Sequence, residues 1–250
     1  PSSLLTVLVL LGIAVTGGSA PPVTKILFRS FSPFPLAFIR FLIASAILFP
    51  FFLKLKRPHF SVLIREVLPI AILSSLNIVF FYLGLLKTTA NASNIIYAGT
   101  PLLVAILAKF LLGERLTLRK IAGILLGFIG VVTIIILPLF GSGQRVTGDF
   151  HGNVLVFVAT ITWALYTIGS RYLTDRRGYQ PLVVTSLSIF TSAAVFLVLG
   201  NFIFPGNYTQ PLSSQSTLFL VLYLAVGPTI GAIFLYQWAI KHLSATTASL

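Results

Sequence analysis

The chain has 250 residues, of which 57% are hydrophobic and 8% are charged, and its mean hydropathy is +1.03. This composition excludes an ordinary soluble domain and indicates an integral membrane protein. The formal net charge of +13 is compatible with nucleic-acid binding, but the placement of the basic residues indicates membrane topology instead.

A helix needs about 20 mainly apolar residues to cross a bilayer. Eight segments meet this requirement: 3–27, 35–53, 67–86, 91–112, 118–139, 153–172, 181–204 and 216–240. A ninth span begins at Ser244 and is cut at Leu250. We therefore predict an all-α integral membrane protein with about eight and a half spans of a ten-span fold. The first apolar run reaches Pro21 without a basic leader, which disfavours a secretory signal peptide.

The basic residues divide unequally between the two sides of the predicted membrane. Twelve fall in or beside the connections 2–3, 4–5, 6–7 and 8–9. The opposite side carries four, which are Lys25, Arg29, Lys87 and Arg145. This positive-inside bias predicts a multi-pass protein of the cell (inner) membrane with a cytoplasmic N-terminus.

An internal repeat relates the two halves of the chain. Tyr82 aligns with Tyr236 at a shift of 154 residues, and Lys25 aligns with Arg171 at a shift of 146. We predict one five-helix repeat over 1–140 and a second, truncated repeat over 147–250. Because each repeat has an odd number of spans, the two copies face opposite ways across the bilayer, as in carriers that alternate between two faces.

Prolines and glycines interrupt three of the spans. Each proline removes an amide donor and leaves the carbonyl four residues earlier without its helical partner. Irregular backbone inside a membrane is tolerated where protein or water lines it, so these positions predict hinges beside a cavity, although bending for better packing is the alternative. The predicted hinge residues are Gly17, Gly18, Pro21, Pro22, Pro101 and Pro228.

Polar and aromatic residues inside the spans are candidates for the cavity wall, because such groups are costly in lipid. Amides, hydroxyls and aromatic faces suit a small organic solute that is partly apolar. The predicted substrate-binding residues are Thr16, Ser19, Asn77, Asn94, Tyr97, Trp163, Tyr166, Tyr236 and Gln237. For Asn77 the alternative is a hydrogen bond between helices, and for Tyr236 it is anchoring at the membrane interface.

Charged groups suggest no catalytic or metal centre. The sequence has no cysteine, and His59, His151 and His242 lie far apart along it, so we expect no metal site and no cofactor. The acidic residues lie near span ends, where Asp149 is placed to cap the sixth span. Arg40 lies inside the second span, where it can reach the head groups, pair within the protein or bind an anionic solute.

A stripe of small residues marks the fifth span, with Gly123, Gly127 and Gly130 on one helix face. Close packing within one subunit is favoured over a dimer contact. Monomer and homodimer both stay open.

Several segments together resemble the EamA domain of the drug/metabolite transporter superfamily. They are GGSAP at 17–21, RFLIA at 40–44, TPL at 100–102, LLGERLT at 111–117, GD at 148–149 and WALY at 163–166. The resemblance implies ten spans in two inverted five-helix copies, a central cavity open alternately to each side, and transport of metabolites such as amino acids.

We therefore expect a secondary carrier, with export favoured, whose partners are a small-molecule substrate and the lipid bilayer and not nucleic acid. A passive channel is the first alternative, because the sequence does not exclude it. A membrane-embedded lipid-modifying enzyme is less favoured, because it would need acidic or histidine clusters near the interface.

Overall fold

The computed structural model describes residues 3–56, 59–112, 118–140, 147–203, 205–206, 208 and 210–242. Among these residues, eight helices are long and apolar enough to cross a membrane, which confirms the eight expected spans. The start of the ninth span at Ser244 lies outside the described residues, and so do residues 113–117 of the LLGERLT segment.

The eight spans consist mainly of α-helix. Two short 3₁₀ segments lie at or between the ends of spans, and two further segments are π-helical. In chain order the elements are α1 (Ser3–Leu27), α2 (Pro33–Lys54), α3 (Phe60–Glu66), α4 (Leu68–Lys87), α5 (Ala90–Tyr97), α6 (Thr100–Leu112), α7 (Leu118–Ile136), η1 (Leu137–Phe140), α9 (Phe150–Arg171), the π-helical η2 (Tyr172–Arg176), α10 (Pro181–Phe202), η3 (Gln210–Ser213), α11 (Gln215–Leu224), the π-helical η4 (Ala225–Gly231) and α12 (Ala232–His242).

Local sequence signals explain where several helices begin. Pro33 and Pro181 lie in the first turns of α2 and α10, where proline's missing amide costs nothing. The Thr89 hydroxyl accepts a hydrogen bond from the amide of Ala92 at 3.1 Å and caps α5. The Asp149 carboxylate accepts one from the amide of Gly152, also at 3.1 Å, which confirms the predicted cap of the sixth span.

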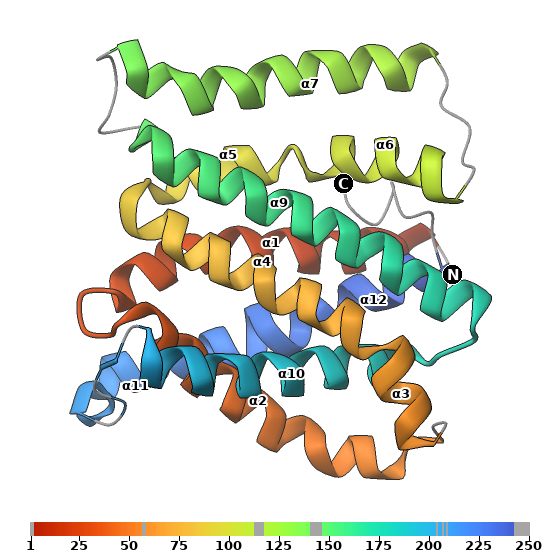
Figure 1. Ribbon diagram of the computed structural model, residues 1–250, viewed down its shortest axis with the longest axis vertical. Coiled ribbons are helices and arrows are strands. Elements are labelled where there is room, and N and C mark those ends of the chain that lie inside the picture. Colours follow the sequence, from red (N-terminus) through yellow and green to blue (C-terminus); the bar gives the residue numbers. More distant parts are fainter. Residues whose placement is uncertain are drawn as a thin grey trace.

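The centre of the bundle is formed by α4 against α9 and by α10 against both α2 and α4 (Figure 1). Glycines allow the backbones of α4 and α9 to approach closely. A Cβ added to Gly84 would lie 2.8 Å from the carbonyl oxygen of Gly152. Between α2 and α10, Phe41 stacks on Phe196 with ring centroids 5.6 Å apart. Close packing of this kind holds the two repeats together, and buried hydrogen bonds such as the one between Ser75 of α4 and Ser192 of α10 add to it.

The helix α7 stands apart from the rest of the bundle and touches it mainly through α5, α6 and α9 (Figure 1). The interpretation of its glycine stripe as close packing within one subunit is therefore wrong for two of the three residues. A Cβ on Gly123 or Gly130 would meet no other atom within 4 Å among the described residues, whereas on Gly127 it would meet Leu102.

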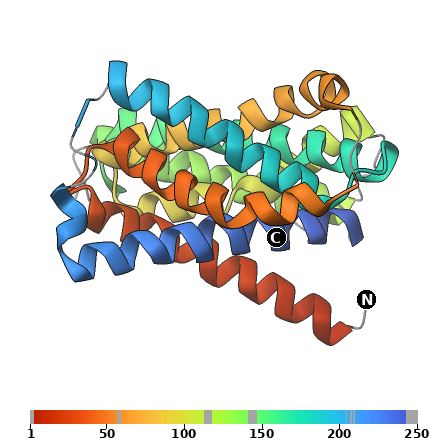
Figure 2. The ribbon, with the colours of Figure 1, turned by 90° about the horizontal axis from the view of Figure 1, so that it is seen from below.

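The helix α1 is continuous through Pro21 and Pro22. Figure 2 shows its N-terminal end leaving the bundle, so that Leu8 and Leu11 are exposed. Its C-terminal part returns to α4 and α5, where the ammonium group of Lys25 donates hydrogen bonds to the carbonyls of Leu85 at 2.5 Å and Thr88 at 2.8 Å. A cation at these carbonyls stabilises the C-terminal end of α4.

Candidate functional site

Four helices form a closed ring of contacts beside the α4–α9 centre of the bundle. In order around the ring, α1 contacts α5, α5 contacts α9, α9 contacts α12, and α12 contacts α1. Within the described part of the chain, the diagonal pairs α1–α9 and α5–α12 are not packed closely against each other. Two of these helices come from the first half of the chain and two from the second.

Eight of the nine predicted substrate-binding residues lie on these four helices, and Asn77 lies on the neighbouring α4. The pairs on each ring helix are Thr16 and Ser19 on α1, Asn94 and Tyr97 on α5, Trp163 and Tyr166 on α9, and Tyr236 and Gln237 on α12.

Trp163 lies between two tyrosine rings. Its ring centroid is 5.0 Å from that of Tyr166 and 5.2 Å from that of Tyr236, with interplanar angles of 34° and 33°. The Tyr236 hydroxyl also shares a hydrogen bond of 2.7 Å with Thr167 on α9. Because Tyr236 is buried among these groups, the alternative of interfacial anchoring is wrong for it. The indole of Trp163 stays partly exposed, as a ring that contacts a ligand must be.

Gln237 ties α12 to the same side of α9. Its Nε2 atom donates hydrogen bonds to the Tyr166 hydroxyl at 2.7 Å and to the Ser170 hydroxyl at 2.9 Å. Its side chain is fully buried, yet its Oε1 atom has no hydrogen-bond donor among the described residues. A buried acceptor of this kind is costly unless a donor reaches it.

Asn77 connects α4 to α5 and α9. Its Nδ2 atom donates to the Tyr97 hydroxyl at 2.5 Å and to the carbonyl of Ala159 at 2.7 Å. Asn77 is buried and Tyr97 is half-buried. This geometry matches the alternative of a hydrogen bond between helices, and it also fixes the hydroxyl of Tyr97.

The carbonyls deprived of a donor by Pro22, Pro101 and Pro228 are each served by a polar side chain. Asn94 donates to Gly18 at 3.2 Å, Thr100 donates to Tyr97 at 2.6 Å, and Thr229 donates to Leu224 at 2.7 Å. The backbone differs at the three places. It stays α-helical in α1, breaks between α5 and α6, and widens to a π-helix in η4. Side chains thus replace the lost amide donors, as expected for irregular backbone in lipid.

The polar groups of α1 face α11 and η4. The Ser19 hydroxyl shares a hydrogen bond of 2.6 Å with the Tyr223 hydroxyl, and the Thr16 hydroxyl donates to the carbonyl of Gly12 at 2.6 Å. A Cβ on Gly17 or Gly18 would meet nothing within 4 Å among the described residues. The α1 backbone is therefore open at these two glycines, next to the carbonyl that Asn94 reaches.

Arg40 does not extend to the head groups. Its side chain is only 4% exposed and donates hydrogen bonds to the Thr229 hydroxyl and, at 3.2 Å, to the Tyr82 hydroxyl. Snorkelling is therefore wrong for Arg40, which pairs within the protein and links α2 to α4 and η4. Through Thr229, the guanidinium is connected to the carbonyl that Pro228 leaves open.

Sequence reasoning missed three residues that complete these contacts, Ser170, Tyr223 and Thr229, and it noted Thr100 only as a polar residue of the fourth span. A signal exists for two of them, because Thr100 and Thr229 directly flank Pro101 and Pro228. A threonine beside a helix proline can donate to the open carbonyl. Among the described residues, no group of three His, Asp or Glu side chains could hold a metal ion.

The fold and these buried polar contacts define a polytopic helical membrane protein whose two halves share a ring of helices. The chain belongs to the EamA-like transporter family, whose model matches residues 4–136 and 150–250.

Relatives in bacteria and archaea are similar over most of the chain. The transporter YetK of Bacillus subtilis is 27% identical, covering 93% of this chain and 71% of its own length. A transporter of Archaeoglobus fulgidus is 30% identical, covering 90% and 76%. The inner membrane transporter YedA of Escherichia coli is 26% identical, covering 96% and 76%.

A solved crystal structure shares the fold. It has a TM-score of 0.72 and 18% sequence identity, and it covers 99% of this chain and 83% of the other. At this level of identity the likeness concerns the fold alone.

Proposed function

We propose that the chain is a secondary carrier that exports small metabolites, such as amino acids or related organic solutes, by alternating access. One observation carries the proposal: the ring of α1, α5, α9 and α12, each of which contributes polar or aromatic side chains. The bound solute would stack on the partly exposed Trp163, and once the contacts between the repeats open it would donate a hydrogen bond to Oε1 of Gln237, which is buried in this structure.

The ring also suggests how access alternates. The contacts α1–α5 and α9–α12 are made within one repeat, whereas α5–α9 and α12–α1 join the two repeats. The two inverted repeats, 1–140 and 147–250, would rock against each other so that the two inter-repeat contacts open in turn, with the N-terminus in the cytoplasm. The irregular backbone at Pro101 and Pro228 lies on these moving elements.

Counterflow in proteoliposomes tests the proposal. The liposomes are preloaded in turn with unlabelled amino acids, amines and nucleosides, and uptake of the labelled solute is followed. A carrier accumulates label transiently above equilibrium. Rapid flux without overshoot would indicate a channel instead, and turnover of added lipid would indicate an enzyme.

Two tryptophans provide a matched pair for the site. Trp163→Ala removes two ring contacts, each worth about 0.5–1.5 kcal/mol, and should lower transport about tenfold at equal expression. Trp238→Ala is the control, because Trp238 stacks on His242 near the end of α12 instead. Normal transport by both Trp163→Ala and Asn94→Ala would contradict the site.

A further inference from the structure

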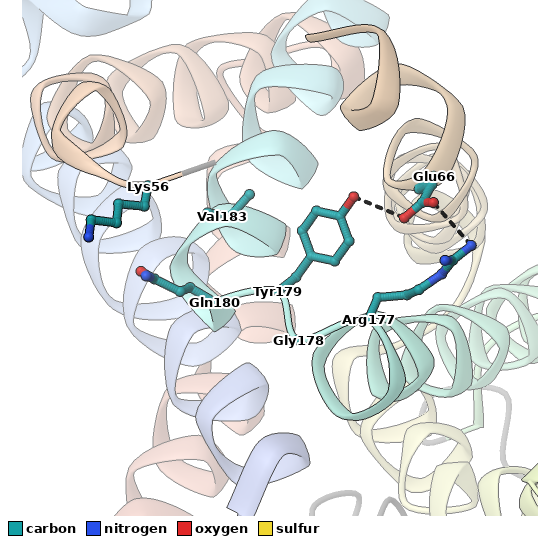
Figure 3. A pocket seen from close by; sticks show the side chains of 7 residues that line it. All are labelled: Lys56, Glu66, Arg177, Gly178, Tyr179, Gln180 and Val183. Atoms are coloured by element: carbon teal, nitrogen blue, oxygen red, sulfur yellow. Dashed lines mark hydrogen bonds and ion pairs between the residues drawn. The ribbon is translucent and has the colours of Figure 1, made fainter. Parts of the chain in front are cut away.

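A polar pocket lies away from the helix ring, at the end of the molecule where basic residues gather. Its volume is about 360 Å³, and it lies between the end of α2, the end of α3 and the turn from η2 to α10 (Figure 3). The two repeats meet here, since α2 and α3 belong to the first and α10 to the second. The polar side chains that line it are Lys56, Glu66, Arg177, Tyr179 and Gln180.

The pocket has a rigid apolar floor. Tyr179 and Val183 line it and also pack into a buried cluster with Phe52, Leu63 and Val67. Gly178 forms the turn before α10 with a φ of +71°, which favours glycine. Tyr179 is therefore held against a packed cluster, whereas Lys56 is exposed just beyond the end of α2.

The carboxylate of Glu66 is already engaged on both oxygens. The Tyr179 hydroxyl donates to Oε2 at 2.9 Å, and the Arg177 guanidinium lies 3.1 Å from Oε1 (Figure 3). Burial, and then the bond to Glu66, raise the pKa of Tyr179, so its hydroxyl stays protonated as a donor. Arg177 balances the charge of Glu66, and this acid offers nothing further to a cation.

Lys56 lies on the opposite side of the pocket from Glu66 and Arg177 (Figure 3). It is exposed and has no acidic partner among the described residues. With two cations and one carboxylate, the pocket has an excess positive charge, and the Gln180 amide, on the same side of the pocket as Lys56 (Figure 3), is a further donor. These groups suit an anion with several acceptor oxygens.

The pocket lies at the level where spans end, because α2 ends at Lys54 and α10 begins at Pro181. Large apolar side chains are exposed on the elements beside it, with Phe51 at 58% and Phe60 at 73%. Below the pocket, the surface of α2 faces acyl chains. A ligand that matches both features has an anionic head and an apolar tail.

We propose that this pocket binds the phosphate of an anionic phospholipid of the cytoplasmic leaflet, with Lys56 as its main contact. The negative potential of that leaflet concentrates such lipids at the basic end of the protein. The bound lipid would bridge the first and second repeats where they meet, outside the transport pathway.

The test uses the whole protein in phosphatidylcholine nanodiscs, with phosphatidylglycerol added in increasing amounts and the thermal unfolding midpoint measured. We expect a saturable rise for the wild type. Lys56→Gln should weaken the apparent affinity about fivefold, which corresponds to about 1 kcal/mol per basic residue near an anionic surface. Lys56→Arg should restore it.

Lys54→Gln is the matched control, because Lys54 is exposed on the same end of α2 and does not line the pocket. Equal weakening by Lys54→Gln and Lys56→Gln would overturn the proposal in favour of diffuse attraction to the membrane. If glycerol phosphate or inorganic phosphate raised the unfolding midpoint equally without anionic lipid, the ligand of the pocket would be a soluble anion and not a lipid. A wild-type unfolding midpoint that does not change with phosphatidylglycerol would also overturn the proposal. None of these outcomes depends on transport.

Discussion

The Nδ2 atom of Asn94 lies 3.2 Å from the carbonyl oxygen of Gly18, the acceptor that Pro22 deprives of its helical donor. This bond joins α5 to α1 where the α1 backbone is open. It gives Asn94 a structural partner and still leaves it beside the centre of the ring.

Replacing Asn94 by alanine should therefore act on transport more than on stability. The lost hydrogen bond is worth about 1 kcal/mol, and the contact between α1 and α5 should loosen. We expect transport to fall several-fold while the unfolding midpoint changes little. Asn201→Ala is the control, because Asn201 also donates to a carbonyl, that of Leu197 in its own helix at 2.6 Å. Equal transport by the two variants at matched expression would contradict a role for Asn94.

Thr229→Val should destabilise the protein strongly. Thr229 accepts from the buried Arg40 and donates to the carbonyl of Leu224, so valine leaves both without this partner. Hydrogen bonds to charged groups contribute about 1.5–3 kcal/mol, and we expect a loss in this range. Thermal unfolding in detergent measures it.

The comparison for Thr229 is Thr133→Val on α7. The Thr133 hydroxyl donates only to the carbonyl of Ile129 in its own helix, at 2.8 Å on an exposed face. That variant should stay within about 0.5 kcal/mol of the wild type. If the two variants lost the same stability, the hydrogen bond of Thr229 to Arg40 would not stabilise the protein.

Gln237→Leu should raise the KM of the transported solute. The free Oε1 of Gln237 is an acceptor that the solute can satisfy, and one hydrogen bond corresponds to about a two- to tenfold change. Gln237→Glu keeps an acceptor at this position and should favour cationic solutes over neutral ones. An unchanged KM and an unchanged solute preference in both variants would exclude Gln237 from the site.

Gly84→Ala should lower stability by about 1–3 kcal/mol, because the new methyl group would collide with the backbone of Gly152. Gly130→Ala on α7 meets no other described residue within 4 Å, and helix propensity alone should make it neutral or slightly stabilising. Chemical unfolding of both variants compares them directly. A tolerated Gly84→Ala would mean that α4 and α9 can separate without cost.

Much of this architecture could be predicted from the sequence, because a membrane imposes length and apolarity on every span. Charge and proline positions then predict caps and open carbonyls, such as Asp149 at α9 and Leu224 before Pro228. The partners of those groups could not be predicted in this way. Asn94 and Gly18, for example, are 76 residues apart in the sequence and meet only in the folded protein. Spacing along one helix gives the face that a side chain occupies, but not the neighbour that this face meets.

Arg40 and α7 also show that the sequence predicts a feature without predicting its neighbours in the fold. The apolar sequence around Arg40 does not reveal that hydroxyls from α4 and η4 converge on it, so the head groups are an equally good partner from the sequence alone. The glycine stripe of α7 has the spacing of a packed helix, yet α7 lies at the edge of the bundle. Helix order along the chain does not determine which helix lies at the periphery of the bundle.

The division of the ring between helices of the two repeats has an evolutionary consequence. Neither repeat encloses the centre alone, since α1 and α5 supply one side and α9 and α12 the other. A change that enlarges or recharges one side can be compensated from the opposite repeat, which is an independent stretch of sequence. With the solute bound in the ring as proposed, the two repeats supply two walls that can diverge separately, and new solute preferences can arise from a change in either one.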